Sequence, residues 1–306
     1  MKLSFSLIVT LIRRDKGLQC PNLSTGELME PELLATSLLG LSMAMSFAWA
    51  LQRATGASGW VDTVWSFAVG IVGMAAALRP IDGIVSPRQW MVASLVGFWS
   101  LRLGGHIARR TMRGGDDPRY AVLAQEWGKN FPLRLFLFLQ IRAVAGVILV
   151  LAVRLAATNK AAFPSYGDMA GVALLAVAIA GEAVADAQLD RFRLQYQGSL
   201  SVCETGLWRW SRHPNYFFEW LCWCAWPLIA IDLTGAHPWG WISLAAPALM
   251  YALLVHVSGI PPLERHMIAT RGNDYRRLQA RVNAFFPGPR RTSVTALKTT
   301  TRSKSR

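Results

Sequence analysis

Residues 206–219 bring together side chains that can bind a charged cofactor, in the order GLWRWSRHPNYFFE. Arginines can hold phosphates, an imidazole can donate a hydrogen bond, and a carboxylate can bind hydroxyl or amide groups. An apolar run follows this segment directly, so we interpret it as a cofactor site at the boundary of a bilayer. Its polar members are Arg209, Arg212, His213, Asn215, Tyr216 and Glu219.

Three carboxylates stand at helical spacing near the end of an earlier apolar run. Glu182, Asp186 and Asp190 are four residues apart, so a helix places them on one face. They repel each other unless cations or hydroxyl groups lie against them. We interpret Glu182 and Asp186 as ligands of a bound molecule. The alternative, a solvated helix end paired with Arg191 and Arg193, is the interpretation we favour for Asp190.

Polar groups also stand at the ends of other apolar runs. Arg102 and His106 are four residues apart, and the Gly/Asp-rich loop after them is either structural or ligand-facing. Asp62 either caps a helix or lines a pocket for an apolar substrate with one polar group. Arg142 lies too deep in its run to reach the headgroups easily. The segment after Pro262 either floats at the interface or folds back over the cofactor.

These groups stand among long apolar runs. Of the 306 residues, 53% are hydrophobic and 16% are charged, whereas about a quarter are charged in soluble proteins. Each run approaches the roughly 20 residues that cross a bilayer. We therefore predict an all-α, polytopic transmembrane bundle of about seven spans, forming one domain over residues 29–288. The runs cover about 31–51, 61–78, 89–107, 133–157, 167–187, 217–233 and 241–258.

The net charge of +14 is distributed unevenly along the chain. With seven spans and the N-terminus outside, cations gather in the inner loops and the C-terminal tail, which predicts a cytoplasmic C-terminus in the cell inner membrane. The short outer loops keep only Arg79, Arg88 and Lys160. Residues 289–306 are expected to be a disordered basic tail attracted to anionic lipids. No basic helix or aromatic platform accompanies the charge, which argues against nucleic-acid binding.

Residues 1–28 do not fit this topology. Their apolar stretch is too short to span a bilayer, and the cations that follow it reverse the charge order of a signal peptide. We expect a non-native or disordered extension and a true start at Met29; an amphipathic inner-face segment would require a different topology. The cysteines have no zinc-ligand spacing, so we predict no metal site. They are Cys20, Cys203, Cys222 and Cys224.

Residues 206–219 resemble the Leu-Trp-Arg-(Tyr/Trp)-Ser-Arg-His-Pro-Asn-Tyr-Phe-Gly-Glu signature of the steroid 5-alpha-reductase-like membrane proteins. The resemblance covers about residues 33–288 and is closer to a bacterial family of uncharacterised members with that C-terminal domain. Isoprenylcysteine carboxyl methyltransferases, which use S-adenosylmethionine, carry a similar Arg-His-Pro-x-Tyr segment. Phe218 stands where the signature has glycine, and its ring either narrows the approach to the cofactor or faces lipid.

The resemblance implies a seven-helix bundle that opens to the cytoplasm and binds NADPH from that side. Arginines near the inner face would hold the phosphates, acidic and amide groups would bind the ribose hydroxyls and the carboxamide, and His213 and Tyr216 would orient the ring. The residues expected at the cofactor are Glu182, Asp186, Arg191, Arg209, Arg212, His213, Asn215, Tyr216 and Glu219.

The reaction implied is the reduction of a carbon–carbon double bond in a lipophilic substrate, such as a sterol-like, polyprenyl or fatty enone. A side chain must then hold the developing oxyanion, and our candidates are Asp62 and Tyr120, with His213 and Tyr216 also catalytic. The expected partners are this small molecule and membrane lipids. Two alternatives stay open: a lipid methyltransferase that uses S-adenosylmethionine, and a lipid-binding membrane protein without catalysis.

Overall fold

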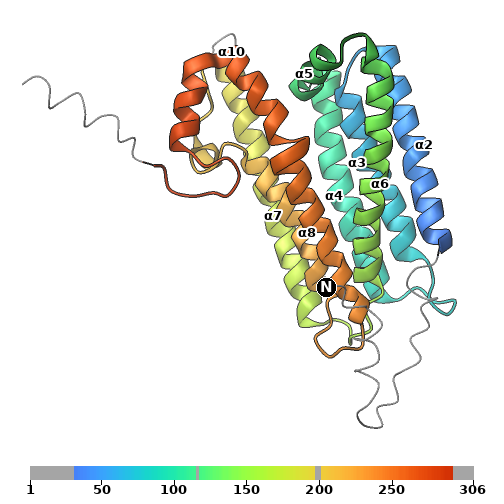
Figure 1. The fold of residues 1–306 in the computed structure, drawn as a ribbon. Coiled ribbons are helices and arrows are strands. Elements are labelled where there is room, and N and C mark those ends of the chain that lie inside the picture. The colour runs from blue at the N-terminus through green and yellow to red at the C-terminus, as the bar shows by residue number, and fades with distance from the viewer. Residues whose placement is uncertain (1–30, 115–116, 197–200, 292–306) are drawn as a thin grey trace, which may run out of the picture.

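The computed structural model describes residues 31–114, 117–196 and 201–291. These residues form helices and no strand, and the long helices run side by side in one bundle (Figure 1). This confirms the all-α prediction for the described part of the chain. The extension at residues 1–28, the start at Met29 and the tail from residue 292 lie outside the described residues.

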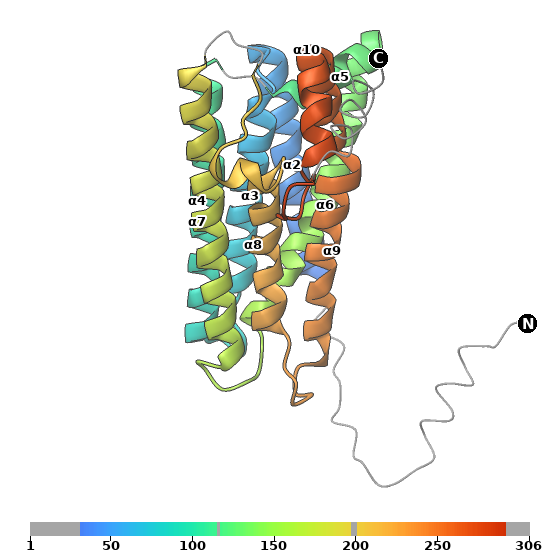
Figure 2. The same cartoon turned by 90° about the vertical axis from the view of Figure 1, so that its left-hand side faces the viewer.

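Six long helices form the body of the bundle, and a broken seventh stretch completes it (Figures 1 and 2). The six are α2 (Pro31–Thr55), α3 (Gly59–Leu78), α4 (Pro87–Met112), α6 (Phe131–Ala157), α7 (Tyr166–Gln195) and α8 (Pro214–Ala230). The broken stretch runs through η3 (Pro238–Leu244), α9 (Ala245–Tyr251), η4 (Ala252–Val257) and α10 (Ile260–Arg281). The short elements between are α5 (Pro118–Trp127), η1 (Gly128–Asn130) and η2 (Gly206–Arg209).

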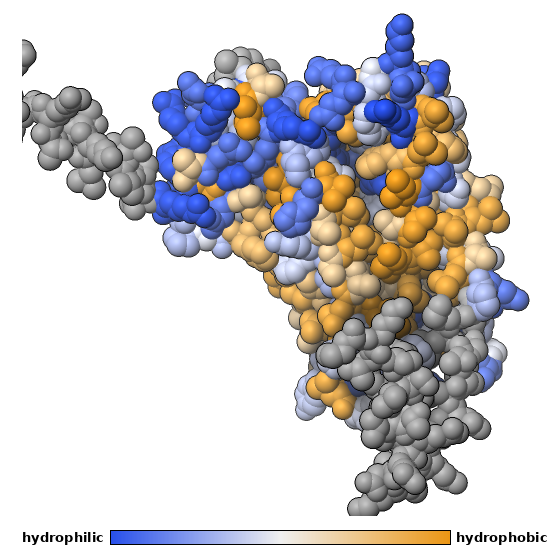
Figure 3. Space-filling view, in the orientation of Figure 1, coloured by the Kyte–Doolittle hydropathy of each residue, from blue (hydrophilic) through white to orange (hydrophobic). Residues whose placement is uncertain are grey.

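Five helical stretches among the described residues are long and apolar enough to cross a membrane. They are Pro31–Thr55, Gly59–Leu78, Pro118–Ala157, Tyr166–Gln195 and Pro238–Arg281. Side chains such as Phe47, Ile71 and Phe98 are each 60% exposed on the outside of the bundle. Figure 3 shows a broad apolar surface over the middle of the bundle and hydrophilic residues at the end that carries α5 and α10. The chain is therefore a multi-pass membrane protein.

Helices α4 and α8 are the predicted spans that fall outside this set. Helix α8 has only 17 residues, and α4 contains several arginines, including Arg88 and Arg102. Both nevertheless run alongside the apolar helices in both views (Figures 1 and 2). Both contribute polar side chains to the interior of the bundle, where Arg88, Arg102 and Glu219 pair with other residues.

Small residues and indoles set the packing of the two helix pairs α3–α4 and α7–α8. Gly70 faces Ser100 between α3 and α4, and Gly171 faces Ile229 between α7 and α8, so a larger side chain at either glycine would clash. Where the pairs meet, the rings of Trp99 and Trp223 contact edge to face with centroids 5.0 Å apart. The close approach of these helices brings residues distant in sequence around one interior space.

The last helical stretch turns back over the bundle. Helix α9 continues into η4, a π-helix, and α10 then carries a left-handed residue, Gly272 (φ 55°), that only glycine adopts without strain. Beyond α10 the backbone N–H of Arg212 donates to the carbonyl of Asn283 at 2.9 Å. Phe285 packs against Trp220, with centroids 5.8 Å apart. The C-terminal segment is thus tied to the start of α8.

Candidate functional site

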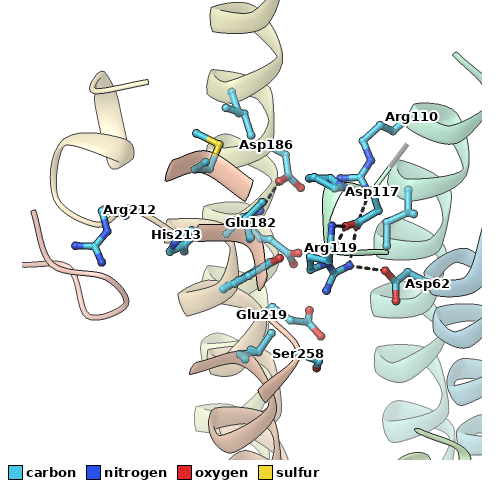
Figure 4. Close-up of a pocket in the computed structure, with 18 of the residues that line it drawn as sticks. Asp62, Arg110, Asp117, Arg119, Glu182, Asp186, Arg212, His213, Glu219 and Ser258 are labelled. Carbon is cyan, nitrogen blue, oxygen red and sulfur yellow. Dashed lines mark hydrogen bonds and ion pairs between the residues drawn. The ribbon is translucent and has the colours of Figure 1, made fainter. Parts of the chain in front are cut away.

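A cavity of about 630 Å³ lies inside the bundle at the end where α4 finishes and α8 begins. Its volume is in the range of pockets that hold cofactors and drug-sized ligands. Apolar side chains from α6 and from the α9–η4 stretch form part of the wall, and charged side chains come from α3, α4, α5, α6, α7, α8 and α10. Figure 4 shows the labelled charged residues around it.

Most of the predicted site residues meet at this cavity. Side chains separated by more than 150 positions in the sequence converge because the helix pairs pack against each other. Tyr120 is buried beside the cavity without lining it, and it bonds to Asp62, which does line it. The predicted residues that line the cavity are Asp62, Glu182, Asp186, Arg212, His213, Asn215, Tyr216 and Glu219.

Two predicted phosphate ligands, Arg191 and Arg209, do not line the cavity and are exposed. Arg191 follows Asp186 by five residues, which rotates it about 140° away from the cavity face of α7. Arg209 lies in η2, where its carbonyl accepts from Arg290 at 3.3 Å. The structure therefore does not support the phosphate role predicted for these two arginines.

The carboxylates of α7 meet a cation, as their spacing requires. Arg102 of α4 forms ion pairs of 2.6 Å with Glu182 and 2.5 Å with Asp186. The Asp186 carboxylate also lies 3.7 Å from the His106 imidazole and accepts from the Asn215 amide at 3.4 Å. Arg102 and His106 thus face the acidic side of α7. From the loop that follows α4, Asp117 lines the cavity.

Asp190 behaves as the solvated helix end that its position predicts. Its side chain is 50% exposed and lies 3.8 Å from Arg193. Asp186 is therefore the last acidic residue of α7 that lines the cavity. Beyond it Leu189 and Phe192 line the cavity, as does Arg193, which follows Asp186 by seven residues and returns to the same side of the helix.

Glu219 of α8 is held by two indoles. The Nε1–H groups of Trp99 and Trp223 each donate to its carboxylate at 3.0 Å. The carboxylate oxygens of Glu219 and Glu182 and the Cys222 thiol lie within 4.8 Å of one another. The fold thus brings two acidic groups and a thiol together, which their separation in the sequence does not reveal.

Asp62 and Tyr120, predicted separately, form one hydrogen-bonded group. The Asp62 carboxylate accepts from Arg119 and from Arg142, both at 2.5 Å. The Tyr120 hydroxyl accepts from Arg142 at 2.8 Å and donates to Asp62 at 3.5 Å. The Arg142 guanidinium also lies over the Trp65 ring, 4.9 Å from its centroid. The deep arginine of α6 is therefore stabilised by a carboxylate and an aromatic face rather than by headgroups.

Asp117 fixes the start of α5 and thereby the position of Arg119. Its carboxylate accepts from the backbone N–H of Arg119 at 3.0 Å and from the Arg119 guanidinium at 2.9 Å, and Arg110 lies 3.3 Å away. Burial would raise the pKa of Asp117, but the charge and hydrogen bonds of Arg119 outweigh it and hold that pKa well below its usual range. The carboxylate is therefore ionised and orients Arg119 toward Asp62.

Arg212 and His213 line the cavity, and both also contact Glu264 of α10. The Glu264 carboxylate accepts from the Arg212 Nε at 2.7 Å and lies 3.0 Å from the His213 Nε2. Burial would raise the pKa of Glu264, but the hydrogen bonds from His213 and Arg212 lower it to about 2. Burial also lowers the pKa of His213. The His213 ring stacks on the Tyr216 ring, with ring centroids 5.6 Å apart.

Five arginines that line the cavity were not predicted from the sequence as site residues. Arg119 and Arg142 bind Asp62, and the other three are Arg110, Arg193 and Arg271. Arg193 is close enough to the other two to feel their positive charge. The Nε–H groups of Arg110 and Arg271 are buried and have no hydrogen-bond partner among the described residues. Such donors suit an anion. The spacing from Asp186 points to Arg193, whereas Arg271 reaches the cavity only because α10 folds back.

Phe218 neither narrows the cavity nor lines it. Its ring packs against Gly181 of α7, where a Cβ would collide with it. The signature has glycine at position 218. Here the phenyl ring of Phe218 fits at that position because Gly181 on α7 has no side chain to collide with it.

The helices and the buried cavity together define a multi-pass helical membrane protein with a charged cavity inside its bundle. The chain belongs to the family described as "Protein of unknown function (DUF1295)", which matches residues 48–282. An uncharacterized protein of Schizosaccharomyces pombe is 28% identical over 233 residues. The match covers 67% of this chain and 64% of that relative. No solved structure matches the chain.

Proposed function

We propose that the protein is a membrane-embedded reductase that uses NADPH to reduce a carbon–carbon double bond in a lipophilic substrate. The observation that carries this proposal is the make-up of one cavity. It joins an arginine-lined region, an acidic centre, and a hydrogen-bonded group around Asp62 next to an apolar wall. A charged cofactor and an apolar substrate can therefore meet in the same space.

The charged part of the cavity fits a dinucleotide phosphate. Arg110, Arg193 and Arg271 offer guanidinium groups to the phosphates, two of them through buried Nε–H donors without partners among the described residues. Asp186 and Asn215 offer an acceptor and an amide to ribose hydroxyls. When bound, NADPH supplies the hydride. The stacked His213 and Tyr216 rings would form the surface against which its nicotinamide is oriented.

The other part of the cavity fits an apolar molecule with one oxygen. Trp65 lines it and has a buried Nε1–H with no hydrogen-bond partner among the described residues. Asp62, Arg119 and Arg142 also line it, so a substrate carbonyl would lie among strong donors and its developing charge would be stabilised. The Tyr120 hydroxyl accepts from Arg142 and does not line the cavity, so Tyr120 would position Arg142 rather than touch the substrate.

Access from the bilayer follows from two residues that belong both to the cavity wall and to the outer surface. Ile141 of α6 is 67% exposed and Val257 of η4 is 56% exposed, and both line the cavity. In a membrane these exposed apolar side chains face lipid tails. A lipophilic substrate can thus enter sideways between α6 and η4 without crossing water.

The proposal includes the topology that the charges indicate. Helices α4 and α8 join the five apolar stretches to give seven spans, with the N-terminus outside and the cavity, the basic loops and the C-terminus on the cytoplasmic side of the inner membrane. NADPH would then reach Arg193 and Arg271 from the cytoplasm, where it is made.

A second candidate is supported by the same acidic centre. Glu182, Asp186 and Glu219 outnumber the cation that pairs with them directly, Arg102. Such an excess also suits the ammonium and sulfonium groups of S-adenosylmethionine, so a lipid methyltransferase is the alternative function. It accounts less well for the partnerless donors of Arg110 and Arg271, because S-adenosylmethionine has no phosphate.

The test is a thermal-shift titration of the purified protein with NADPH, NADH and S-adenosylmethionine. A ligand at 100 times its dissociation constant stabilises the folded state by about 2.7 kcal/mol. We expect stabilisation by NADPH that is lost in Arg193→Ala and kept in Arg191→Ala, the exposed arginine two positions away. Stabilisation by S-adenosylmethionine alone would replace the reductase with the methyltransferase. No response to any of the three would favour a lipid-binding protein without catalysis.

A further inference from the structure

Two buried carboxyl groups face each other where α7 and α8 pack together at the cavity wall. Glu182 is 4% exposed and Glu219 is 6% exposed. Their oxygens lie within 4.8 Å of each other, and both residues line the cavity. Two carboxylates this close and this buried repel each other, so a cation or a proton between them stabilises the pair.

The charged groups around the pair do not neutralise it. The Arg102 guanidinium forms ion pairs with both Glu182 and Asp186. The two donors to Glu219, from Trp99 and Trp223, are neutral indoles. On α4 the other titratable neighbour is His106, 3.7 Å from Asp186, and on α8 it is the Cys222 thiol. One guanidinium therefore serves three carboxyl groups.

One oxygen of the pair has nothing to bond to. Glu182 Oε2 is buried and has no hydrogen-bond partner among the described residues. An ionised oxygen in that position would lack any compensation for its lost hydration. A proton on one of the two carboxyl groups would instead remove one negative charge from the pair.

We propose that Glu182 and Glu219 share one proton and that this proton completes the reduction. The second clause rests on the proposed function; the first does not. Reduction adds two hydrogens across the double bond. The hydride from NADPH forms the first C–H bond as the π bond breaks, and the carbon left with the electron pair takes the proton from the carboxyl pair. The pair is left with two negative charges, and NADPH is oxidised to NADP⁺.

The proton is then replaced from the aqueous side. His106 lines the same cavity, is 28% exposed at its side chain, and lies beside Asp186, which shares Arg102 with Glu182. The imidazole is thus a partly exposed titratable group that borders the same cavity as the buried pair. His106 is therefore the group we assign to reloading rather than to the reacting carbon.

The first experiment is infrared difference spectroscopy of the purified protein without cofactor, across a pH titration. A protonated carboxyl group gives a C=O band that an ionised one lacks, and ¹³C-glutamate labelling shifts it while ¹³C-aspartate labelling does not. We expect such a band at pH 7 in the wild type. We expect it to disappear in both Glu182→Gln and Glu219→Gln, because either remaining carboxylate ionises once its neighbour is neutral.

The matched control is Glu126→Gln, a surface glutamate 43% exposed that pairs with Arg265; this variant should keep the band. Loss of the band in only one of the two cavity variants would overturn sharing and place the proton on a single carboxyl group. A wild type without the band would overturn the proposal outright. So would a metal ion bound at one per chain and lost in both variants. The labelled wild type decides the question even if the variants do not fold.

The second experiment tests the use of the proton. NADPH oxidation with a long-chain aliphatic enone is followed against pH, and the wild-type rate should fall as pH rises through the titration of the infrared band. Glu219→Gln should lower the rate about 10²-fold or more, the size of general-acid catalysis, and lose that pH dependence. An unchanged pH profile would remove the pair from the proton step. If no NADPH is oxidised, the reductase proposal fails while the infrared result still stands.

Discussion

Two buried clusters of charge lie at opposite ends of α4 and α7, and they differ in how completely they are satisfied. At the start of these helices Arg88 forms a 2.7 Å ion pair with Asp168 and donates to the carbonyls of Asn159, Ala161 and Ala162. Asp168 in turn bonds to Ser165 in a capping box. Both charged residues are almost fully buried, and every polar contact closes within the protein.

At the other end of α4 and α7, several buried polar groups have no hydrogen-bond partner among the described residues. Among the described residues, the buried side-chain nitrogens and oxygens without a hydrogen-bond partner belong to Trp65, Arg102, Arg110, Glu182 and Arg271. Four of these residues line the cavity, and Arg102 is ion-paired to two that do. Buried polar groups in folded proteins are almost always bonded. The comparison shows that the polar groups of the first cluster satisfy one another, while the second keeps donors and acceptors that we propose bind a ligand.

The largest effect should come from breaking the closed cluster. Asp168→Ala leaves the Arg88 guanidinium buried without its carboxylate, which should lower the free energy of unfolding by about 3–5 kcal/mol. Thermal unfolding in detergent measures this loss. Asp190→Ala, on an exposed part of the same helix, should stay close to the wild type. Equal losses in both variants would contradict the structural role of the Arg88–Asp168 pair.

A charge in the open cluster should matter more for binding than for stability. Arg271→Ala should weaken NADPH binding about 10-fold or more, since a charged hydrogen bond contributes roughly 1.5–3 kcal/mol, and should reduce its salt dependence. Calorimetric titration of the folded variant measures both. Arg276→Ala, five positions further along α10 and exposed, is the control. A large loss of thermal stability in Arg271→Ala without ligand would contradict this expectation, because Arg271 would then stabilise the fold as the Arg88–Asp168 pair does.

The tie between α8 and α10 should respond to acid. The pKa of Glu264 is about 2 in the folded protein against an ordinary 4.5, so its contribution to stability is complete above about 4.5. That contribution is lost as the pH falls from 4.5 toward 2. Unfolding midpoints measured across this range should decline, and Glu264→Gln should remove part of the decline. A variant with an unaltered pH dependence would show that Glu264 is not the responsible group.

The smallest effect should be a gain. Glu182→Gln removes one of the crowded carboxylates while Asp186 still pairs with Arg102, so the cofactor-free protein should be unchanged or more stable by up to about 1 kcal/mol. Chemical denaturation measures the change. A loss comparable to that of Asp168→Ala would mean that the acidic centre stabilises the fold in the way the Arg88 cluster does.

The sequence predicted what local spacing controls. The four-residue spacing placed Glu182 and Asp186 on one face, and the structure adds Arg102 as their partner. The same helical geometry points to Arg193 rather than Arg191, because seven residues return to a helix face and five do not. Hydropathy found the apolar helices, and five stretches have the length and composition to cross a membrane. The further spans at α4 and α8 stay predictions.

What the sequence did not predict depends on segments that meet only after folding. Asp62 and Tyr120 were separate candidates, and their connection runs through Arg142 on a third helix. Arg212 was predicted to bind phosphate, yet its guanidinium pairs with Glu264 because α10 folds back. No periodicity in the sequence encodes that return, which depends on the turn at Gly272 and on the docking of Phe285.

The last helical stretch lines the cavity on both sides of the end of the π-helix η4. Leu254 lines it from within η4, and Arg271 lines it from α10. A π-turn holds one residue more than an α-turn. Deleting a single residue between Ala252 and Val257 would restore α-helical register and rotate everything after it by about 100°. Glu264 and Arg271 would then turn away from Arg212 and the cavity together, so one inserted amino acid sets the alignment of the whole C-terminal arm.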